Sequence, residues 1–459
     1  MKVIFENIGP VRNAELELRD LTIIAGPNNT GKTYLAYTLY GFLSLIRQPL
    51  FLRHSAKHLP FDLDKAVSEI LDSGKLQFPV RDFEQKAKQA IRHIFRISGD
   101  KISDIFSSPE ADFKEAEFYL HPDDFLPDRL ESSLQFNIGR KRDCHLATSF
   151  ENNLLSFSLS NCEASAPPEI MREALIIGFI RLCMPNLPKP FILSAERFGI
   201  SLFYKELDFT KNRLVETLQK FRDKGNRNNI DPFFLLMDQA SSRYAQPIKD
   251  NIDFTRDLEL TQKKRSPLID SKLSDNVREM LGGYFKHKSG DIRFISKARK
   301  HGKFDIPLHI ASSSARGLSD LYFFLRHAAQ EDQLLIIDEP ESHLNAANQI
   351  EMARLLVRCV NSGLKVLITT HSDYMIKEFN NLIMLGRNFS GKTEFLRKYS
   401  NCYGENDYLR QDAVAAYISE KGSLTACEVD HLGLNMPNFD QTIDEINRIA
   451  NELAMSVEG

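Results

Sequence analysis

Residues 26–33 read GPNNTGKT, in which two glycines separated by four residues are followed by a Lys-Thr pair. This G-x-x-x-x-G-K-[ST] pattern binds phosphate when it joins a strand to a helix, and here it follows the apolar run LTIIA and opens a helical pattern. Glycines let backbone N–H groups turn toward a polyphosphate, and the helix start adds positive potential. We therefore predict an ATP-binding loop made of Gly26, Pro27, Asn28, Asn29, Thr30, Gly31, Lys32 and Thr33.

Two side chains of this loop and two that lie far along the chain have predicted roles in hydrolysis. Lys32 would supply a positive charge to the β- and γ-phosphates, and Thr33 a hydroxyl to Mg²⁺. Asp338 ends the apolar run LLII, where ligands of parallel sheets bind, so we predict that it holds Mg²⁺ through water. Glu339 follows it and is the predicted general base, which polarises the attacking water.

A histidine stands at the end of another apolar run. The run KVLITT ends directly before His371, so this side chain could reach a γ-phosphate oxygen or the attacking water. A single histidine is often a surface or capping residue. Its spacing from Asp338, with a helix and a strand between them, favours the catalytic role.

A serine-rich stretch, HIASSSARGLSDLYFFL, occupies residues 309–325 and leads into an apolar helix. Hydroxyl donors at a helix N-terminus form an anion site. The alternative is an ordinary helix cap, in which one serine caps the helix and the others are solvated. The stretch by itself leaves both interpretations open.

These motifs require a scaffold that brings the ends of several strands together. Apolar strands that alternate with helical patterns predict an α/β fold with a mostly parallel sheet. The stretch LQFNIGRKRDCHLATSFENNLLSFSLS predicts an antiparallel β lobe, and polar amphipathic stretches predict helical insertions.

The motifs divide the chain into predicted segments. These are an N-terminal ATPase part with the phosphate loop (1–48), a helical insertion (49–124), a β lobe with a core strand (125–200), a helical arm or partner-docking insertion (201–290), a C-terminal ATPase part (291–400) and an accessory segment (401–459). The fourth segment lacks a heptad pattern sustained over three repeats, which argues against a long coiled-coil arm.

Composition narrows the class of protein. The chain has 459 residues, enough for two or three domains. Its formal net charge of −3 indicates no general electrostatic attraction to nucleic acid. Its six cysteines have no paired spacing and predict free thiols in a reducing, cytoplasmic environment. We expect no membrane span and no secretory leader, because the sequence has neither a long apolar run nor an apolar leader region.

The chain resembles the ATP-binding-cassette ATPases of the SMC-like and OLD group. The resemblance lies in GPNNTGKT, SSSARGLSD, LLIIDEPESHLN and ITTHSDY, in that order. It implies a P-loop ATP-binding-cassette core that hydrolyses ATP with Mg²⁺. In this family the serine-rich signature contacts the γ-phosphate bound to the opposite subunit. The resemblance therefore implies that Ser313, Ser314 and Gly317 face a partner's ATP, in a head-to-tail homodimer with two ATPs at its interface.

The sequence departs from the family pattern within the signature and after the predicted magnesium ligand. Ala315 and Arg316 stand where small glycines are expected, and Asn345 stands where many relatives carry an aspartate.

The position of the family's glutamine loop also differs. It is taken by FILSAERFG, which offers Glu196 and Arg197 instead of glutamine. This pair could act near Mg²⁺ or at the dimer contact, or it could form an ion pair at a strand end that contributes little. Gln135 is a second, weaker candidate for the glutamine.

Three stretches resemble one branch of this group, the ATPase subunits of two-gene bacterial anti-phage defence systems. They are SSSARGLSDLYFFLRHA, RYAQPIKDNIDFTRDL and EVDHLGLNMPNFDQTIDEIN. The resemblance implies an ATPase that scaffolds or restrains a separate effector, a nuclease or a toxin. The tail after ITTHSDY lacks the glutamate and D-x-D set of a TOPRIM nuclease, so we expect the effector to be another chain.

Other functions stay open from the sequence. A DNA-repair or recombination ATPase that clamps DNA would use the basic runs 140–142, 263–265 and 297–303, although such runs are usually solvated. DNA or RNA therefore stays open as a partner. A transporter ATPase fits poorly because the signature is wrong and the polar insertions are large. A scaffold that binds ATP and hydrolyses it slowly is the remaining alternative.

Overall fold

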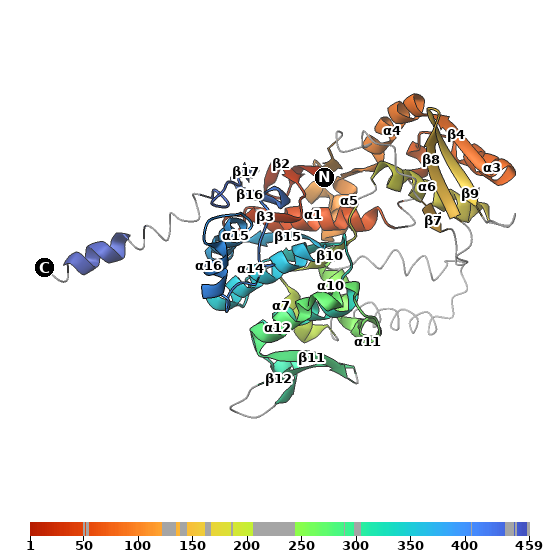
Figure 1. The fold of residues 1–459 in the computed structure, drawn as a ribbon. Helices are drawn as coiled ribbons and strands as arrows, with labels where there is room; N and C mark the ends of the chain where they lie inside the picture. Colours follow the sequence, from red (N-terminus) through yellow and green to blue (C-terminus); the bar gives the residue numbers. More distant parts are fainter. Residues whose placement is uncertain are drawn as a thin grey trace.

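The computed structural model describes most of the chain (Figure 1). The described residues are 1–48, 51, 55–121, 135–137, 145–160, 167–184, 187–204, 244–288, 290–297, 304–404, 406–436, 445 and 448–456. Two of the three basic runs, 140–142 and all but Lys297 of 297–303, lie outside these residues, as does much of the predicted helical arm.

A ten-stranded sheet forms the centre of the chain. Its order is β10 (Pro190–Leu193), β14 (Leu334–Asp338), β15 (Lys365–Thr370), β3 (Leu21–Ala25), β16 (Val414–Glu420), β17 (Ser423–Cys427), β2 (Val11–Glu17), β1 (Lys2–Ile8), β6 (Glu117–Leu120) and β5 (Arg96–Ser98). The strands from β10 to β16 are parallel, and the pairs β16–β17, β2–β1, β1–β6 and β6–β5 are antiparallel. The predicted α/β fold with a parallel core is confirmed.

Burial explains why the core strands are parallel and central. Every residue of β3 and β14 is buried, as is all of β15 except its first residue. In β3, Ile24 packs into one hydrophobic cluster, whereas Ile23 and Ala25 pack into the other. Such a strand needs helices on both faces, as parallel sheets have.

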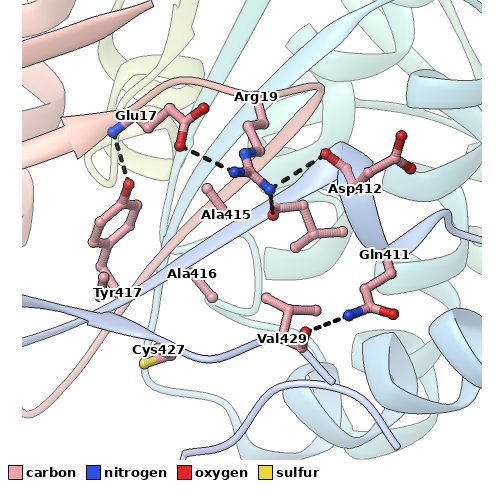
Figure 2. A pocket seen from close by; sticks show the side chains of 11 residues that line it. Glu17, Arg19, Gln411, Asp412, Ala415, Ala416, Tyr417, Cys427 and Val429 are labelled. Atoms are coloured by element: carbon pink, nitrogen blue, oxygen red, sulfur yellow. Dashed lines mark hydrogen bonds and ion pairs between the residues drawn. The ribbon is translucent and has the colours of Figure 1, made fainter. Parts of the chain in front are cut away.

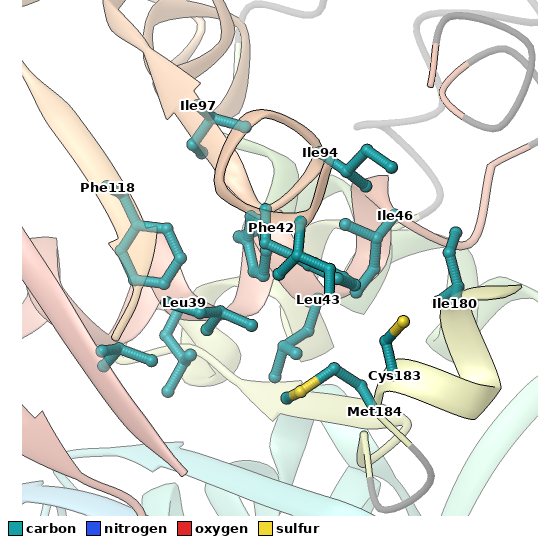
Figure 3. Packing of buried hydrophobic residues seen from close by; sticks show 14 of the residues in the cluster. Leu39, Phe42, Leu43, Ile46, Ile94, Ile97, Phe118, Ile180, Cys183 and Met184 are labelled. Carbon is teal, nitrogen blue, oxygen red and sulfur yellow. The ribbon is translucent and has the colours of Figure 1, made fainter. Parts of the chain in front are cut away.

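One face of the parallel core is covered by α1 (Lys32–Leu45). Its apolar side packs against residues of the predicted insertion and of α6 (Pro168–Cys183), as Figure 3 shows. The labelled residues are Leu39, Phe42, Leu43, Ile46, Ile94, Ile97, Phe118, Ile180, Cys183 and Met184. The other face is covered by α13 (Ser313–Phe323), α14 (Ala346–Asn361) and α15 (Asp373–Leu385).

Two smaller antiparallel sheets flank the core. One has the order β4 (Lys75–Pro79), β9 (Leu154–Ser160), β8 (His145–Glu151) and β7 (Gln135–Asn137), and the other has the order β11 (Gly283–Lys288), β12 (Asp291–Ser296) and β13 (Asp305–Pro307). The remaining α-helices are α3 (Leu63–Ser73), α4 (Val80–Ile94), α5 (Gly99–Phe106), α7 (Arg197–Phe203), α10 (Gln246–Arg256), α11 (Leu258–Thr261), α12 (Leu273–Leu281) and α16 (Lys392–Lys398). A π-helix, η6 (Phe324–Ala328), continues α13, and short 3-10 helices include η5 (Leu308–Ile310).

Two predicted segments need correction. The insertion 49–124 is not purely helical, because it contributes β4 to the small sheet and β5 and β6 to the main sheet. The segment 401–459 is not merely accessory, because its β16 pairs with β3 in the middle of the main sheet. β4, β5 and β6 have five, three and four residues, which leaves little local signal. β16 is longer, with seven residues of which six are buried, but its place beside β3 depends on pairing with a strand far away in the chain.

No helix among the described residues is both long and apolar enough to cross a membrane.

A buried carboxyl group on α13 predicts a specific pH dependence of stability. The Oδ2 of Asp320 accepts a hydrogen bond of 2.9 Å from Thr255, and burial raises the pKa of Asp320 to about 7. Between roughly pH 4 and 7 the folded chain therefore keeps a proton that the unfolded chain releases. Stability from this group is present at low pH and is lost as the pH rises through 7.

We expect Asp320→Asn to be more stable than the wild type at pH 8, by on the order of 2 kcal/mol, because each unit of pKa shift corresponds to about 1.4 kcal/mol. The difference should shrink toward pH 5. Thermal denaturation of the nucleotide-free protein between pH 5 and 8 measures it, with the exposed Asp270→Asn as the control. A difference that stays constant with pH would contradict the assignment.

Candidate nucleotide site

The phosphate loop runs from the end of β3 to the start of α1, and its shape depends on its glycines. Gly26 and Gly31 have φ values of 145° and 95°, and Asn29 has 62°. A Cβ on Gly26 would lie 2.4 Å from the carbonyl oxygen of Ser419, and one on Gly31 would lie 2.5 Å from a methyl of Val11. Both positions therefore require glycine for conformation and for space.

Lys32 is buried at the centre of the loop. Its Nζ donates hydrogen bonds of 2.9 and 2.7 Å to the carbonyl oxygens of Gly26 and Pro27. Burial lowers the pKa of Lys32, and the charges of Glu339, Asp338 and Glu341 raise it in opposition. The ammonium group thus lies among carboxylates and is held over the loop by groups that phosphate oxygens could replace.

Thr33 and Asp338 meet across the sheet end, as predicted for magnesium ligands. The Oγ1 of Thr33 donates to Oδ2 of Asp338 at 2.9 Å, and Thr369 on β15 donates to the other carboxylate oxygen. Asp338 is wholly buried, and burial raises its pKa to about 6 despite both hydrogen bonds. No cationic side chain of the described residues forms an ion pair with this carboxylate, and two hydroxyl groups contact it. A buried carboxylate in these surroundings fits a divalent ion well.

Glu339 begins a tight loop after β14. Its φ of 51° lies in the left-handed region, which costs a residue with a side chain on the order of 1–3 kcal/mol. Its N–H donates to the carbonyl and hydroxyl oxygens of Thr369, both at 3.1 Å, and Ser342 donates to its Oε2 at 3.0 Å. The carboxylate is therefore held at the end of β14, next to Ser342 and within 3.9 Å of His371, and its role as the general base stays a prediction.

His371 lies next to Glu339 and a second glutamate. Its Nδ1 is 3.3 Å from Oε1 of Glu341 and 3.9 Å from Oε1 of Glu339. Glu341 is buried and also accepts from the backbone N–H of His371 at 2.7 Å and from Thr370 at 2.8 Å. The structure thus brings the predicted histidine to the predicted base, and Glu341 orients its ring.

The serines of the serine-rich stretch make different hydrogen bonds. Ser312 caps α13 by accepting from the N–H of Ala315, whereas Ser314 donates to the carbonyl oxygen of His343 at 2.7 Å. Ser313, at the first helical position, is partly exposed, as is Ser314. Ordinary capping therefore accounts for only one serine of the three.

Two neighbouring residues of the signature make contacts within their own chain. Gly317 has little exposed surface one turn into α13, and its carbonyl oxygen accepts a bond from Arg197, but a Cβ added to it would meet no atom within 4 Å, so its predicted contact with a partner's ATP stays a prediction. The guanidinium group of Arg316 lies 4.4 Å from the centre of the Phe198 ring and donates to the carbonyl oxygens of His309 and Ala311.

Glu196 and Arg197, the residues at the family's glutamine position, contact different partners. Glu196 accepts a hydrogen bond of 2.8 Å from Tyr37, close enough to Asp338 for their charges to interact. Arg197 is buried and contacts backbone oxygens rather than Glu196, so the strand-end ion pair is absent between these two residues. Asn345 caps α14, and Gln135 belongs to β7, whose side chains lie outside the described part.

Four residues of the site escaped prediction: Thr369, Glu341, Ser419 and Tyr37. Ser419 on β16 donates to the carbonyl oxygen of Thr30 and so joins the late strand to the phosphate loop. Glu341 and Thr369 stand within two residues of predicted site residues, which is a usable signal. Ser419 and Tyr37 carry no local signal, because only the tertiary fold places them there.

A pocket of about 480 Å³ lies elsewhere, between β2 and the β16–β17 hairpin (Figure 2). It opens where the sheet splits, since β17 pairs with β2 only at Ser423 and Asn13. Arg19 spans its wall to Glu17 and to the carbonyl oxygen of Val414, and Tyr417 accepts from the N–H of Glu17. The polar groups of Glu17, Arg19, Tyr417 and Gln411 in its lining are therefore already paired.

Comparison with known families identifies part of the chain. Residues 196–376 match the model of the AAA ATPase domain, a range that includes the serine-rich stretch, Asp338, Glu339 and His371 but not the phosphate loop. No curated protein matches the chain. On the family match, with the phosphate loop completing the site, the chain is an ATPase.

Several solved structures align with the chain at low similarity. The SMC head domain from Pyrococcus furiosus, bound to the C-terminal domain of ScpA, has 11% identity and a TM-score of 0.33, with 99% of this chain and 98% of that chain covered. The SMC head domain from Thermotoga maritima has 12% identity and a TM-score of 0.31, with 94% and 98% covered. The recombination mediator protein RecF has 10% identity and a TM-score of 0.30, with 93% and 97% covered. These values transfer no function.

Proposed function

We propose that the chain is an SMC-like ATP-binding-cassette ATPase whose ATP-bound homodimer controls a separate effector, a nuclease or toxin, in anti-phage defence. The observation that carries the ATPase part is the meeting of the phosphate loop, Asp338, Glu339 and His371 at one sheet end. The link to defence rests on the sequence resemblance of the three stretches quoted above.

The proposed chemistry assigns one task to each side chain. Backbone N–H groups of the loop and Lys32 bind the β- and γ-phosphates, and Glu339 takes a proton from the attacking water. His371, oriented by Glu341, donates a hydrogen bond to the γ-phosphate or the water. Thr33 and Asp338 would hold Mg²⁺, which supplies positive charge that offsets the phosphate charge when bound.

The homodimer follows from the position of the serines. Within the described residues no hydrogen bond joins Ser313 or Ser314 to the phosphate loop of the same chain, and Ser314 contacts His343 instead. Two partly exposed hydroxyl groups at a helix start are suited to bind the γ-phosphate held by a second copy. Two such copies related by a two-fold axis would complete two sites.

Co-purification tests the effector. An untagged protein encoded beside this chain should co-purify with the tagged ATPase, and ATP should change the amount or the activity of the bound effector. The cytoplasm is the expected compartment, since the four described cysteines are free, two of them buried. If bare DNA strongly stimulates ATP hydrolysis with no second protein, the effector assignment is wrong.

A DNA clamp for repair or recombination is the second candidate, and one observation favours it. Lys263, Lys264 and Arg265 are all exposed on the turn that follows α11, although Arg265 is paired with Asp270. If this run binds DNA, replacing both lysines by alanine should reduce DNA-stimulated hydrolysis, most clearly at low salt.

A further inference from the structure

Arg197, the first residue of α7, is an arginine buried without a carboxylate partner in direct contact. It is 3% exposed, and its guanidinium group donates four hydrogen bonds, all to backbone carbonyl oxygens. Within the described residues no ion pair involves it. A buried charge used in this way costs free energy, which points to a geometric task rather than to stabilisation.

The four carbonyl oxygens belong to three separate elements. One is Ser194, at 3.0 Å, directly after β10. Two belong to Asp338 and Glu339, each at 2.7 Å, at the end of β14. The fourth is Gly317 in α13, at 3.2 Å. Arg197 is thus a direct bridge between the helix that begins with the serines and the backbone of the general base.

The bond to Glu339 falls on a strained peptide. Glu339 has its φ at 51°, and its carbonyl direction is fixed from one side by Arg197, while Thr369 fixes its N–H from the other. Because the carboxylate leaves the chain from this same residue, its direction depends on both contacts. A planar guanidinium group can span the oxygens of Asp338, Glu339 and Gly317 at once, whereas a lysine ammonium group cannot.

Four acidic side chains surround this guanidinium group without touching it. The charges of Asp338, Glu341 and Glu339 oppose the lowering of its pKa by burial, and Asp320 of α13 interacts with it through space. The positive charge is therefore balanced by the carboxylates of Asp338, Glu341 and Glu339, whereas Asp320 on the serine-bearing helix adds its negative charge only as the pH rises through about 7.

We propose that Arg197 is a positioning residue that orients the Glu339 carboxylate toward the attacking water and makes this orientation depend on the position of α13. When the start of α13 engages a γ-phosphate of a second copy, a shift of Gly317 is transmitted through Arg197 to Glu339 of the same chain. This coupling rests on the proposed dimeric function, whereas the aiming of Glu339 requires only ATP hydrolysis.

Arg197→Lys tests the proposal, with Arg354→Lys as the matched control. Arg354 is also buried, at 7% exposure, but it pairs with Glu378 and Glu351 away from the site. We expect Arg197→Lys to lower kcat about 100-fold, as a displacement of about 1 Å can do. The affinity for a fluorescent ATP analogue should stay within about threefold of the wild type, since no phosphate contact is removed. Arg354→Lys should keep both values.

Hydrogen exchange of residues 339–345, the loop that begins with Glu339, measures the coupling itself. In the wild type, ATP·Mg²⁺ should slow exchange both in residues 313–323 and in this loop. In Arg197→Lys residues 313–323 should still respond, whereas the response of the loop should be lost, and a loop that still responds would overturn the coupling. A loss of ATP affinity that parallels the loss of kcat, or an unchanged kcat, would overturn the positioning role. If the wild type never dimerises, the proposed function fails, yet kcat of Arg197→Lys still decides whether Arg197 positions Glu339. If Arg197→Lys does not fold, as judged by thermal melting, Arg197→Gln provides the same comparison.

Discussion

Glu339→Gln should abolish ATP turnover while leaving ATP binding intact. The amide keeps the size of the side chain and can still accept from Ser342, but it cannot take a proton from water. A lost general base typically lowers kcat by about 10²–10⁴-fold. Because the nucleotide then stays bound, the proposed ATP-dependent dimer should accumulate.

Two measurements check this expectation. Phosphate release gives kcat, and size-exclusion chromatography with ATP·Mg²⁺ should show a species near twice the 52.5 kDa of the chain. Glu394→Gln, an exposed carboxylate on α16, serves as the control and should behave as the wild type. If Glu339→Gln keeps normal turnover, the assignment of the base is wrong. If it loses turnover but never changes in mass, the assignment of Glu339 as the general base stands and the proposed ATP-dependent dimer is refuted.

A mixture of two inactive variants should recover activity if each site is shared between two copies. Lys32→Ala removes the charge that binds the phosphates, and Ser314→Glu places a negative charge where the partner's γ-phosphate would lie. In a mixed dimer, one site carries both defects and the other carries none. At equal amounts half of the dimers are mixed and each has one of two sites intact, so about a quarter of the wild-type rate should return.

The controls separate this result from other causes. Each variant alone should show less than about a hundredth of the wild-type rate, with an unchanged melting temperature. Lys398 is exposed on α16, so Lys398→Ala should keep the wild-type rate of ATP hydrolysis both alone and in a mixture. If the mixture stays inactive while both variants remain folded and exchange subunits, each chain hydrolyses ATP alone and the shared site is refuted.

The candidate residues for ATP binding and hydrolysis could be predicted from the sequence because each belongs to a local pattern. The phosphate loop needs glycines at fixed spacing for its positive φ values, and Asp338 and His371 each follow an apolar run that becomes a buried strand. The neighbouring ends of parallel strands then bring them together, with Asp338 opposite Thr369 in the register of β14 and β15.

What the sequence could not decide depends on contacts between distant segments. Arg197 was recognised as a candidate, but its four backbone partners come from three elements that only the fold assembles. The same holds for Gly317, whose carbonyl oxygen meets Arg197 of α7, and for β16, which enters the middle of the sheet from residue 414. Local spacing thus determined which groups are candidates for the chemistry, whereas packing between distant elements determined which contacts hold those groups. The physical reason is that a buried guanidinium group or a central strand is stabilised only by partners far away in the chain.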